Sequence, residues 1–391
     1  MNRPTVEVAD IFRSHGDAFI DSHSLGIQQL KAIQAIWRCR TAALGGHVDV
    51  CPQCGGDPLI SYNSCRNRHC NKCQSQARDR WIEARKQELL NTRYFHVVFT
   101  LPHDLHSLVL QNQLELYNLL FRTVAETLRQ VARDPKHLGA EIGFFSILHT
   151  WGQNLLFHPH IHCVIPGGGV SPDNTQWIQA KDAFFLPVKV LSKVFRGKFV
   201  AGLRRAYRKK QLTCAGSIQY LKDEKRFSAF LRTLFRQNWV VYAKPAFGGP
   251  DQVIRYLGRY THRVAISNHR LVSFEGDQVT FRWRDYAHGN KQRLMTVSAE
   301  EFMRRFLRHI LPKSFVRIRH FGLMANSRRT VFVELCRKLL RMAPLIREAV
   351  KAASNPPWRC PRCQSFMVLI ERLTATQLFW RLSARAFADS S

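Results

Sequence analysis

Residues 157–168 read FHPHIHCVIPGG, a run in which histidines alternate with apolar residues. Side chains two positions apart on a strand project from the same face, so His160 and His162 would present two imidazoles side by side, with Ile161 in the core behind them. His158 could extend the pair, although Pro159 is expected to interrupt regular strand geometry between them. Such a pair either binds a metal ion or consists of surface or hydrogen-bonded core histidines, and the residues alone leave both interpretations open.

Strands and helices alternate on both sides of this run. Apolar runs at 142–151 and 160–166 flank residues 152–159 like two strands joined by a loop, and residues 93–101 resemble a strand that Pro102 ends. Apolar spacing and turn residues further predict helical segments at 11–40, 77–90, 105–133 and 253–260, a hairpin at 271–286 that turns at 275–277, and a helix opened by a capping box of Ser298 with Glu301. This order of elements indicates an α+β fold.

Cysteine pairs are the strongest local signal. Cys51-x2-Cys54 and Cys70-x2-Cys73 are separated by 15 residues, a spacing typical of one tetrahedral zinc site built from two turns. The segment between them is poor in large apolar residues, so a structural metal would stabilise what burial cannot. The alternative is four thiols without metal.

Other potential ligands lie nearby and at the far end of the chain. Cys65 and His69 fall within the loop and could replace a ligand or bind a second ion. Cys360-x2-Cys363 is half of a further pair, but the nearest other cysteine is Cys336, so no complete site can be written from the sequence there.

Two tyrosines lie among arginines in the predicted helix at 253–260. Tyr256 and Tyr260 would stand one helical turn apart, and Arg255, Arg259 and Arg263 surround them. The tyrosines could be core residues, base-stacking platforms or nucleophiles. The arginines could clamp phosphates or form an ordinary basic helix face.

The charge balance indicates a polyanionic partner. The 391 residues include 59 Lys and Arg but only 28 Asp and Glu, which gives a net charge of +31. Nucleic acid is favoured over a membrane, because no run approaches the ~20 apolar residues needed to span a bilayer. The first residues do not resemble a secretory signal, and the 11 cysteines favour metal binding in a reducing compartment, so we expect a cytoplasmic protein.

Taken together, these motifs resemble the HUH-type rolling-circle transposases of the insertion sequence 91 family, in their two-tyrosine form. The matching features appear in the family's order: the cysteine segment 51–73, the strand at 94–102, Thr150 to Gln153, His160-Ile161-His162 and Tyr256-x3-Tyr260. The resemblance implies an N-terminal helical and zinc-binding domain at 1–92, an HUH-type catalytic domain with an antiparallel sheet flanked by helices at 93–320, and a basic C-terminal region at 321–391.

The resemblance also implies a chemistry. His160 and His162 would hold a catalytic Mg²⁺ or Mn²⁺, Tyr256 and Tyr260 would attack single DNA strands at the transposon ends, and a 5′-phosphotyrosine intermediate would preserve the bond energy. Zn²⁺ would be structural, and no nucleotide cofactor is expected, in line with the lack of a P-loop motif. HUH enzymes usually have a third polar metal ligand, for which His149 and Gln153 are the candidates.

Three alternatives compete with this interpretation. A replication initiator or conjugative relaxase would use the same chemistry, but the upstream zinc segment resembles the transposases and the chain is too short for an added helicase. A zinc-containing DNA-binding regulator would use the histidines and tyrosines only for packing or stacking. The chain could also be an inactive transposase, although all the named catalytic residues are present.

Overall fold

The computed structural model describes residues 4–181, 185–245, 258, 265–286, 288–344 and 359–388. The chain forms two compact units, and neither is a continuous stretch of sequence. The first comprises Met1–Trp81, His262–Ile310 and Arg347–Ser391, and the second comprises Ile82–Thr261 and Leu311–Ile346.

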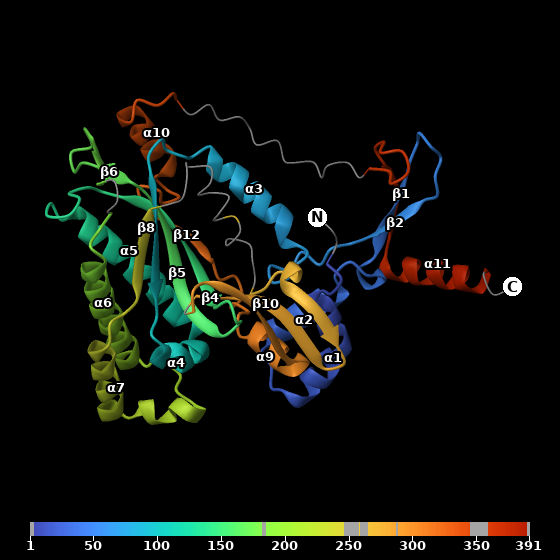
Figure 1. Cartoon of the computed structure of the whole chain (residues 1–391), viewed down its shortest axis with the longest axis horizontal. Coiled ribbons are helices and arrows are strands. Elements are labelled where there is room, and N and C mark those ends of the chain that lie inside the picture. Colours follow the sequence, from blue (N-terminus) through green and yellow to red (C-terminus); the bar gives the residue numbers. More distant parts are fainter. Residues whose placement is uncertain are drawn as a thin grey trace. The chain divides into compact units, whose positions relative to one another are not determined.

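The second unit is built on a five-stranded antiparallel sheet (Figure 1). Its strand order is β12-β4-β5-β3-β8, which places β5 at the centre. The strands are β3 (Tyr94–Thr100), β4 (Gly143–Trp151), β5 (Phe157–Pro166), β8 (Val241–Pro245) and β12 (Ile318–Gly322). The predicted strands at 93–101, 142–151 and 160–166 are therefore confirmed, as is the α+β class.

The predicted interruption of regular strand geometry at Pro159 is confirmed as an irregularity within the strand, although β5 begins at Phe157 and continues through this proline. The β4–β5 register shifts here: Trp151 pairs with Phe157 and His149 with His160, so one residue of β4 lies opposite two of β5. A proline lacks the backbone N–H of the ladder and is tolerated at such a bulge. The strand can therefore contain Pro159 and still align the histidines that follow it.

One face of this sheet packs against helices. Phe99 and Ile161 of the strands join Leu120 of α5 and Phe199 of α6 in a single apolar core. The helices are α4 (His106–Gln111), α5 (Gln113–Arg133), α6 (Val188–Arg208) and α7 (Glu224–Arg236). The unit also contains β6 (Gly168–Val170), β7 (Trp177–Gln179), α10 (Arg329–Leu339) and the 3-10 helices η2 (His103–Leu105) and η3 (Gly216–Lys222).

The helix predicted at 105–133 is interrupted at Asn112. The Asn112 side chain donates to the carbonyl oxygens of Leu108 and Thr213 at 2.9 and 2.8 Å and accepts from the Thr213 amide at 2.7 Å. This side chain pairs with the Leu108 carbonyl, which a continuous helix would pair internally, and with the backbone of a distant segment at Thr213, which explains the break.

In the first unit, the N-terminal helices pack beside a three-stranded sheet and a further helix. The helices are α1 (Val8–Ser22), α2 (Ile27–Arg38) and α9 (Ala299–Leu307), and the sheet order is β11 (Lys291–Ser298), β10 (Gln278–Asp285), β9 (Leu271–Glu275). The predicted hairpin at 271–286 is confirmed, with Gly276 in the turn at φ 55°. The helical segment predicted at 11–40 is two helices, and Gly26, a poor helix former, precedes the second.

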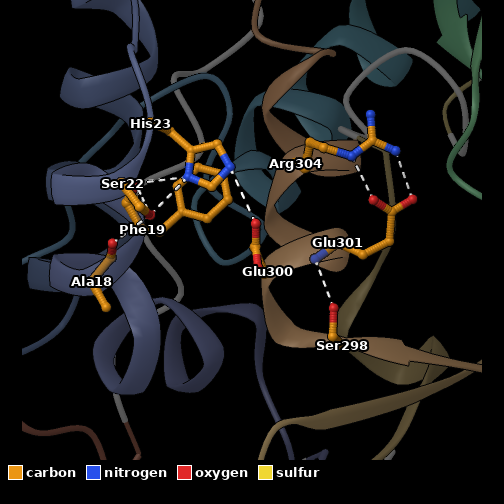
Figure 2. A network of polar contacts seen from close by, with 8 residues as sticks. All are labelled: Ala18, Phe19, Ser22, His23, Ser298, Glu300, Glu301 and Arg304. Carbon is orange, nitrogen blue, oxygen red and sulfur yellow. Dashed lines mark hydrogen bonds and ion pairs between the residues drawn. The ribbon is translucent and has the colours of Figure 1, made fainter.

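The start of α9 is shown in Figure 2. Ser298 Oγ accepts a hydrogen bond from the Glu301 amide at 3.1 Å, which confirms the Ser298 half of the predicted capping box. The Glu301 carboxylate binds the Arg304 guanidinium at 2.5 and 2.7 Å, and this partner lowers the pKa of Glu301 to about 2. His23, just after α1, lies 3.4 Å from the Glu300 carboxylate, which connects α1 to α9.

A second three-stranded sheet of the first unit joins both ends of the chain. Its order is β13 (Val368–Leu373), β1 (Gly46–Val50), β2 (Leu59–Tyr62), and α11 (Ala375–Ala388) follows β13. The helix predicted at 77–90 is observed as α3 (Gln74–Lys86). The first unit also contains the 3-10 helices η1 (Ala42–Leu44) and η4 (Asn268–Arg270). No helix among the described residues is long and apolar enough to cross a membrane.

Candidate metal centres

Three histidines converge on the face of the sheet opposite the helices. His160 and His162 project from β5, and His149 lies directly across from His160 on β4. One ring nitrogen from each lies within 4.8 Å of the others. Ile161 is fully buried in the core on the other face, as the alternation along a strand predicts.

This arrangement brings His149, one of the two residues considered for a third ligand, beside the predicted pair. The ring centroids of His149 and His162 are 4.3 Å apart, and those of His160 and His162 are 4.8 Å apart. Gln153, the other candidate, lies in the loop between β4 and β5. We call His149, His160 and His162 the histidine cluster.

Burial keeps His160 and His162 in the protonation state that binds metals. Removal from water lowers the pKa of His160 to about 3 and holds that of His162 well below its ordinary value, so both imidazoles are neutral at physiological pH. His160 Nδ1 lies 2.6 Å from the His158 carbonyl oxygen and must donate to it, which makes Nε2 the nitrogen with a lone pair. Neutral, convergent imidazoles fit a divalent cation.

His96 of β3 supports the cluster and was missed by the sequence analysis. Its Nε2 lies 2.7 Å from His162 Nδ1, and the two rings are parallel, with an interplanar angle of 2°. Burial lowers the pKa of His96 to about 4. The available signal was a histidine in the otherwise apolar run 94–99, which indicates a polar partner across the sheet.

The first cysteine cluster lies in the first unit and consists of Cys39, Cys65, Cys70 and Cys73. All four sulfurs lie within 4.8 Å of one another, and Cys73 Sγ is 3.4 Å from Cys39 Sγ and 3.6 Å from Cys65 Sγ. Four sulfurs bound to one zinc ion at 2.3 Å stand about 3.8 Å apart in a tetrahedron. The cluster therefore fits a closed structural zinc site.

These thiols cannot all ionise without a cation. Hydrogen bonding with Cys39 lowers the pKa of Cys73 and raises those of Cys65 and Cys70. A bound divalent cation would compensate the negative charge and allow every thiol to serve as a thiolate ligand.

The predicted pairing of cysteines was wrong. Cys70 and Cys73 join Cys39 and Cys65, whereas Cys51 and Cys54 lie with Cys360 and Cys363 in a second cysteine cluster. A spacing of 15 residues is compatible with one shared site, but tertiary folding supplies each pair with other partners. Cys39 follows directly after α2, and no second cysteine stands near it in the sequence to indicate a metal ligand. His69, which the sequence left open as a ligand, does not belong to either cluster.

Tyr256 and Tyr260, together with Arg255, Arg259 and Arg263, lie outside the described residues. Their assignment stays a prediction.

Comparisons with known proteins agree with this layout. A family model described as "Putative transposase" matches residues 143–331, which contain the histidine cluster, and one described as "Transposase zinc-binding domain" matches residues 11–101, which contain the first cysteine cluster. No solved structure matches the chain.

Two curated relatives match over nearly the whole length. The chain is 52% identical over 384 residues to "Putative transposase y4qJ" of Sinorhizobium fredii (strain NBRC 101917 / NGR234), covering 95% of this chain and 96% of the relative. It is 29% identical over 379 residues to "Transposase for insertion sequence element IS801" of Pseudomonas savastanoi pv. phaseolicola, covering 92% and 88%. The chain therefore belongs to the transposases of the insertion sequence 91 family.

Proposed function

We propose that this transposase nicks and rejoins single DNA strands through a 5′-phosphotyrosine intermediate during rolling-circle transposition. The observation that carries the proposal is the histidine cluster: three convergent imidazoles on adjacent central strands of an antiparallel sheet. A regulator that only bound DNA would have no need of such a buried, convergent ligand set, because packing histidines have no reason to direct their nitrogens to one point.

His149, His160 and His162 would hold Mg²⁺ or Mn²⁺, and Mn²⁺ is the better match to an all-imidazole set. The bound ion would polarise the scissile phosphate and offset the charge that develops on it. His96, through His162 Nδ1, would fix the orientation of the His162 ring.

Tyr256 and Tyr260 are the proposed nucleophiles. The tyrosine oxygen attacks the phosphorus, the bond from phosphorus to the 3′ oxygen breaks, the phenol loses its proton, and the departing 3′ oxygen gains one. A tyrosine hydroxyl has an ordinary pKa of about 10, so this attack requires help in removing the proton. The new ester conserves the bond energy, and attack by a 3′-hydroxyl reverses the step without ATP.

Two tyrosines would allow one site to hold two strand ends in turn, which suits transposition of an element with two termini. Arg255, Arg259 and Arg263 are the proposed phosphate contacts next to the nucleophiles. The net charge of +31 favours a nucleic-acid partner generally, and single-stranded transposon ends are the proposed substrate.

The test is cleavage of labelled single-stranded oligonucleotides taken from the ends of the element that encodes this chain, followed by denaturing electrophoresis. We expect a covalent protein–DNA adduct that requires Mn²⁺ or Mg²⁺ and disappears in the Tyr256→Phe, Tyr260→Phe double variant. Tyr220→Phe, at an exposed tyrosine of η3, is the matched control and should retain the adduct. Tight DNA binding without an adduct at any metal concentration would overturn the proposal.

A further inference from the structure

The second cysteine cluster joins the two ends of the chain. Cys51 and Cys54 follow β1, whereas Cys360 and Cys363 precede β13, so the members are up to 312 positions apart in the sequence. Cys51 Sγ lies 3.4 Å from Cys363 Sγ, and Cys54 Sγ lies 3.6 Å from Cys360 Sγ. These distances far exceed the ~2.05 Å of a disulfide bond and are close to the ~3.8 Å expected between sulfurs on one tetrahedral zinc ion.

The two halves of this cluster have the same backbone turn. Gly55 N donates to the Cys51 carbonyl at 3.2 Å, and Gln364 N donates to the Cys360 carbonyl at 2.9 Å. Gly55 and Gln364 both adopt a left-handed conformation, with φ of 59° and 62°. A glutamine rarely adopts this conformation, so its presence at the matching position indicates that the turn itself is required.

Contacts around the sulfurs hold the two turns against each other. Ser365 Oγ donates to Gln53 Oε1 at 2.7 Å. Beyond the turns, β1 and β13 pair in antiparallel fashion, with Val50 opposite Val368. The two cysteine pairs are thus presented to each other by a sheet rather than by a chance approach of loops.

The apolar core at this place is too small to stabilise the arrangement by burial. It consists of Cys51, Cys360 and Met367, with Cys54 and Leu59 packed partly against them. The β13 side chains of Val368, Leu369 and Ile370 are 45–57% exposed. Small units with so little buried apolar surface usually need a metal or a covalent crosslink.

We infer that Cys51, Cys54, Cys360 and Cys363 form a second structural zinc site, which fastens the C-terminal segment to the N-terminal part of the first unit. Cys360 and Cys363 lie outside both ranges matched by the family models, 11–101 and 143–331. The site shares no residue with the first cysteine cluster, so each should load with metal independently. Four thiolates in a closed set select zinc over harder cations such as Mg²⁺.

The test is the metal content of the full chain, measured by inductively coupled plasma mass spectrometry and native mass spectrometry. We expect about two zinc ions per wild-type chain and about one in the Cys360→Ser, Cys363→Ser double variant. Cys214→Ser is the matched control, because Cys214 is a buried free cysteine outside both clusters, and it should retain two. A double variant with the same zinc content as wild type, or iron in place of zinc, would overturn the inference.

A second measurement covers the case in which the double variant fails to fold. Wild-type protein reconstituted with ¹¹³Cd²⁺ should give two resonances in the range of four-thiolate sites, and a single such resonance would contradict the inference. In a folded double variant, hydrogen exchange of β13 and β1 amides should accelerate, while that of β4 and β5 stays unchanged. These readouts do not depend on DNA cleavage, so they stand or fall separately from the proposed function.

Discussion

His96 Nε2 lies 2.7 Å from His162 Nδ1, although the two residues are 66 positions apart in the sequence. Antiparallel pairing of β3 with β5 creates this contact, since Val98 pairs with His162 and His96 projects two residues further along the same face. A hydrogen bond to the second ring nitrogen of a ligating histidine sets its tautomer and orientation. His96 is therefore a positioning residue that acts through His162.

His96→Ala should weaken metal binding without abolishing chemistry. Loss of such an outer partner typically reduces metal affinity by about 10–100-fold, so we expect the half-saturating Mn²⁺ concentration for adduct formation to rise by this factor. Saturating Mn²⁺ should restore most of the activity, which damage to the fold would not allow. The exposed His137→Ala variant serves as control, and an unchanged Mn²⁺ dependence in His96→Ala would contradict the assigned role.

Acidification should destabilise the second unit through His320. Its Nε2 lies 3.1 Å from the Arg85 guanidinium and must accept, and burial together with this cation lowers its pKa to about 4. The folded pKa lies below the unfolded value of about 6.5, so the stabilisation is complete above pH 6.5 and is lost as the pH falls toward 4.

The comparison that isolates this effect is His320→Gln, which keeps an acceptor but does not titrate. Between pH 7 and pH 4.5, wild type should lose about 1–2 kcal/mol more unfolding free energy than the variant, allowing for partial solvent exposure. Denaturant titrations at several pH values measure the difference. Parallel pH profiles for the two proteins would contradict the prediction, because they would mean that folding does not shift the pKa of His320.

Two glycine substitutions should have opposite effects on stability. Gly322 ends β12 at φ 60°, and a Cβ there would collide with the Ile142 carbonyl oxygen, so Gly322→Ala should cost about 2 kcal/mol or more. Gly197 lies within α6, with open space around its Cβ position, and Gly197→Ala should stabilise the protein by about 0.5–1 kcal/mol. Thermal melts of both variants test these predictions. A melting temperature of Gly322→Ala equal to or higher than that of wild type would contradict the first.

The zinc content of two variants should distinguish a ligand of the first cysteine cluster from a neighbouring residue that is not a ligand. Cys39→Ser removes one of four sulfurs and should release zinc from that cluster, although Cys39 lies well before the cysteine pairs. His69→Gln should leave the zinc content unchanged, because His69 lies outside the cluster. Zinc analysis of both variants decides the point, and retention in Cys39→Ser with loss in His69→Gln would reverse the assignment.

The sequence was most informative where structure depends on local pattern. The apolar runs around residues 97, 147 and 163 predicted β3, β4 and β5, and alternation along β5 predicted that His160 and His162 share a face. The breaks at Asn112 and before Gly26 were not predicted, because apolar periodicity continues through them. In the first break, side-chain hydrogen bonds to a distant segment determine where the helix ends.

The metal ligands show the limit of local pattern more clearly. Cys51 and Cys54 have partners more than 300 positions away, and only the pairing of β1 with β13 brings them together. His149 could be named as a candidate because its strand adjoins β5, whereas His96 required the register between β3 and β5. Long-range strand pairing, which no local spacing encodes, decided these cases.

The most direct test of the phosphotyrosine account is identification of the residue that becomes attached to DNA. The adduct formed with single-stranded element ends and Mn²⁺ would be digested with nuclease and trypsin, and the modified peptide would be sequenced by tandem mass spectrometry. The account predicts a nucleotide joined through its 5′ phosphate to Tyr256 or Tyr260. Attachment to any other residue, or cleavage that leaves no nucleotide on the protein, would contradict it.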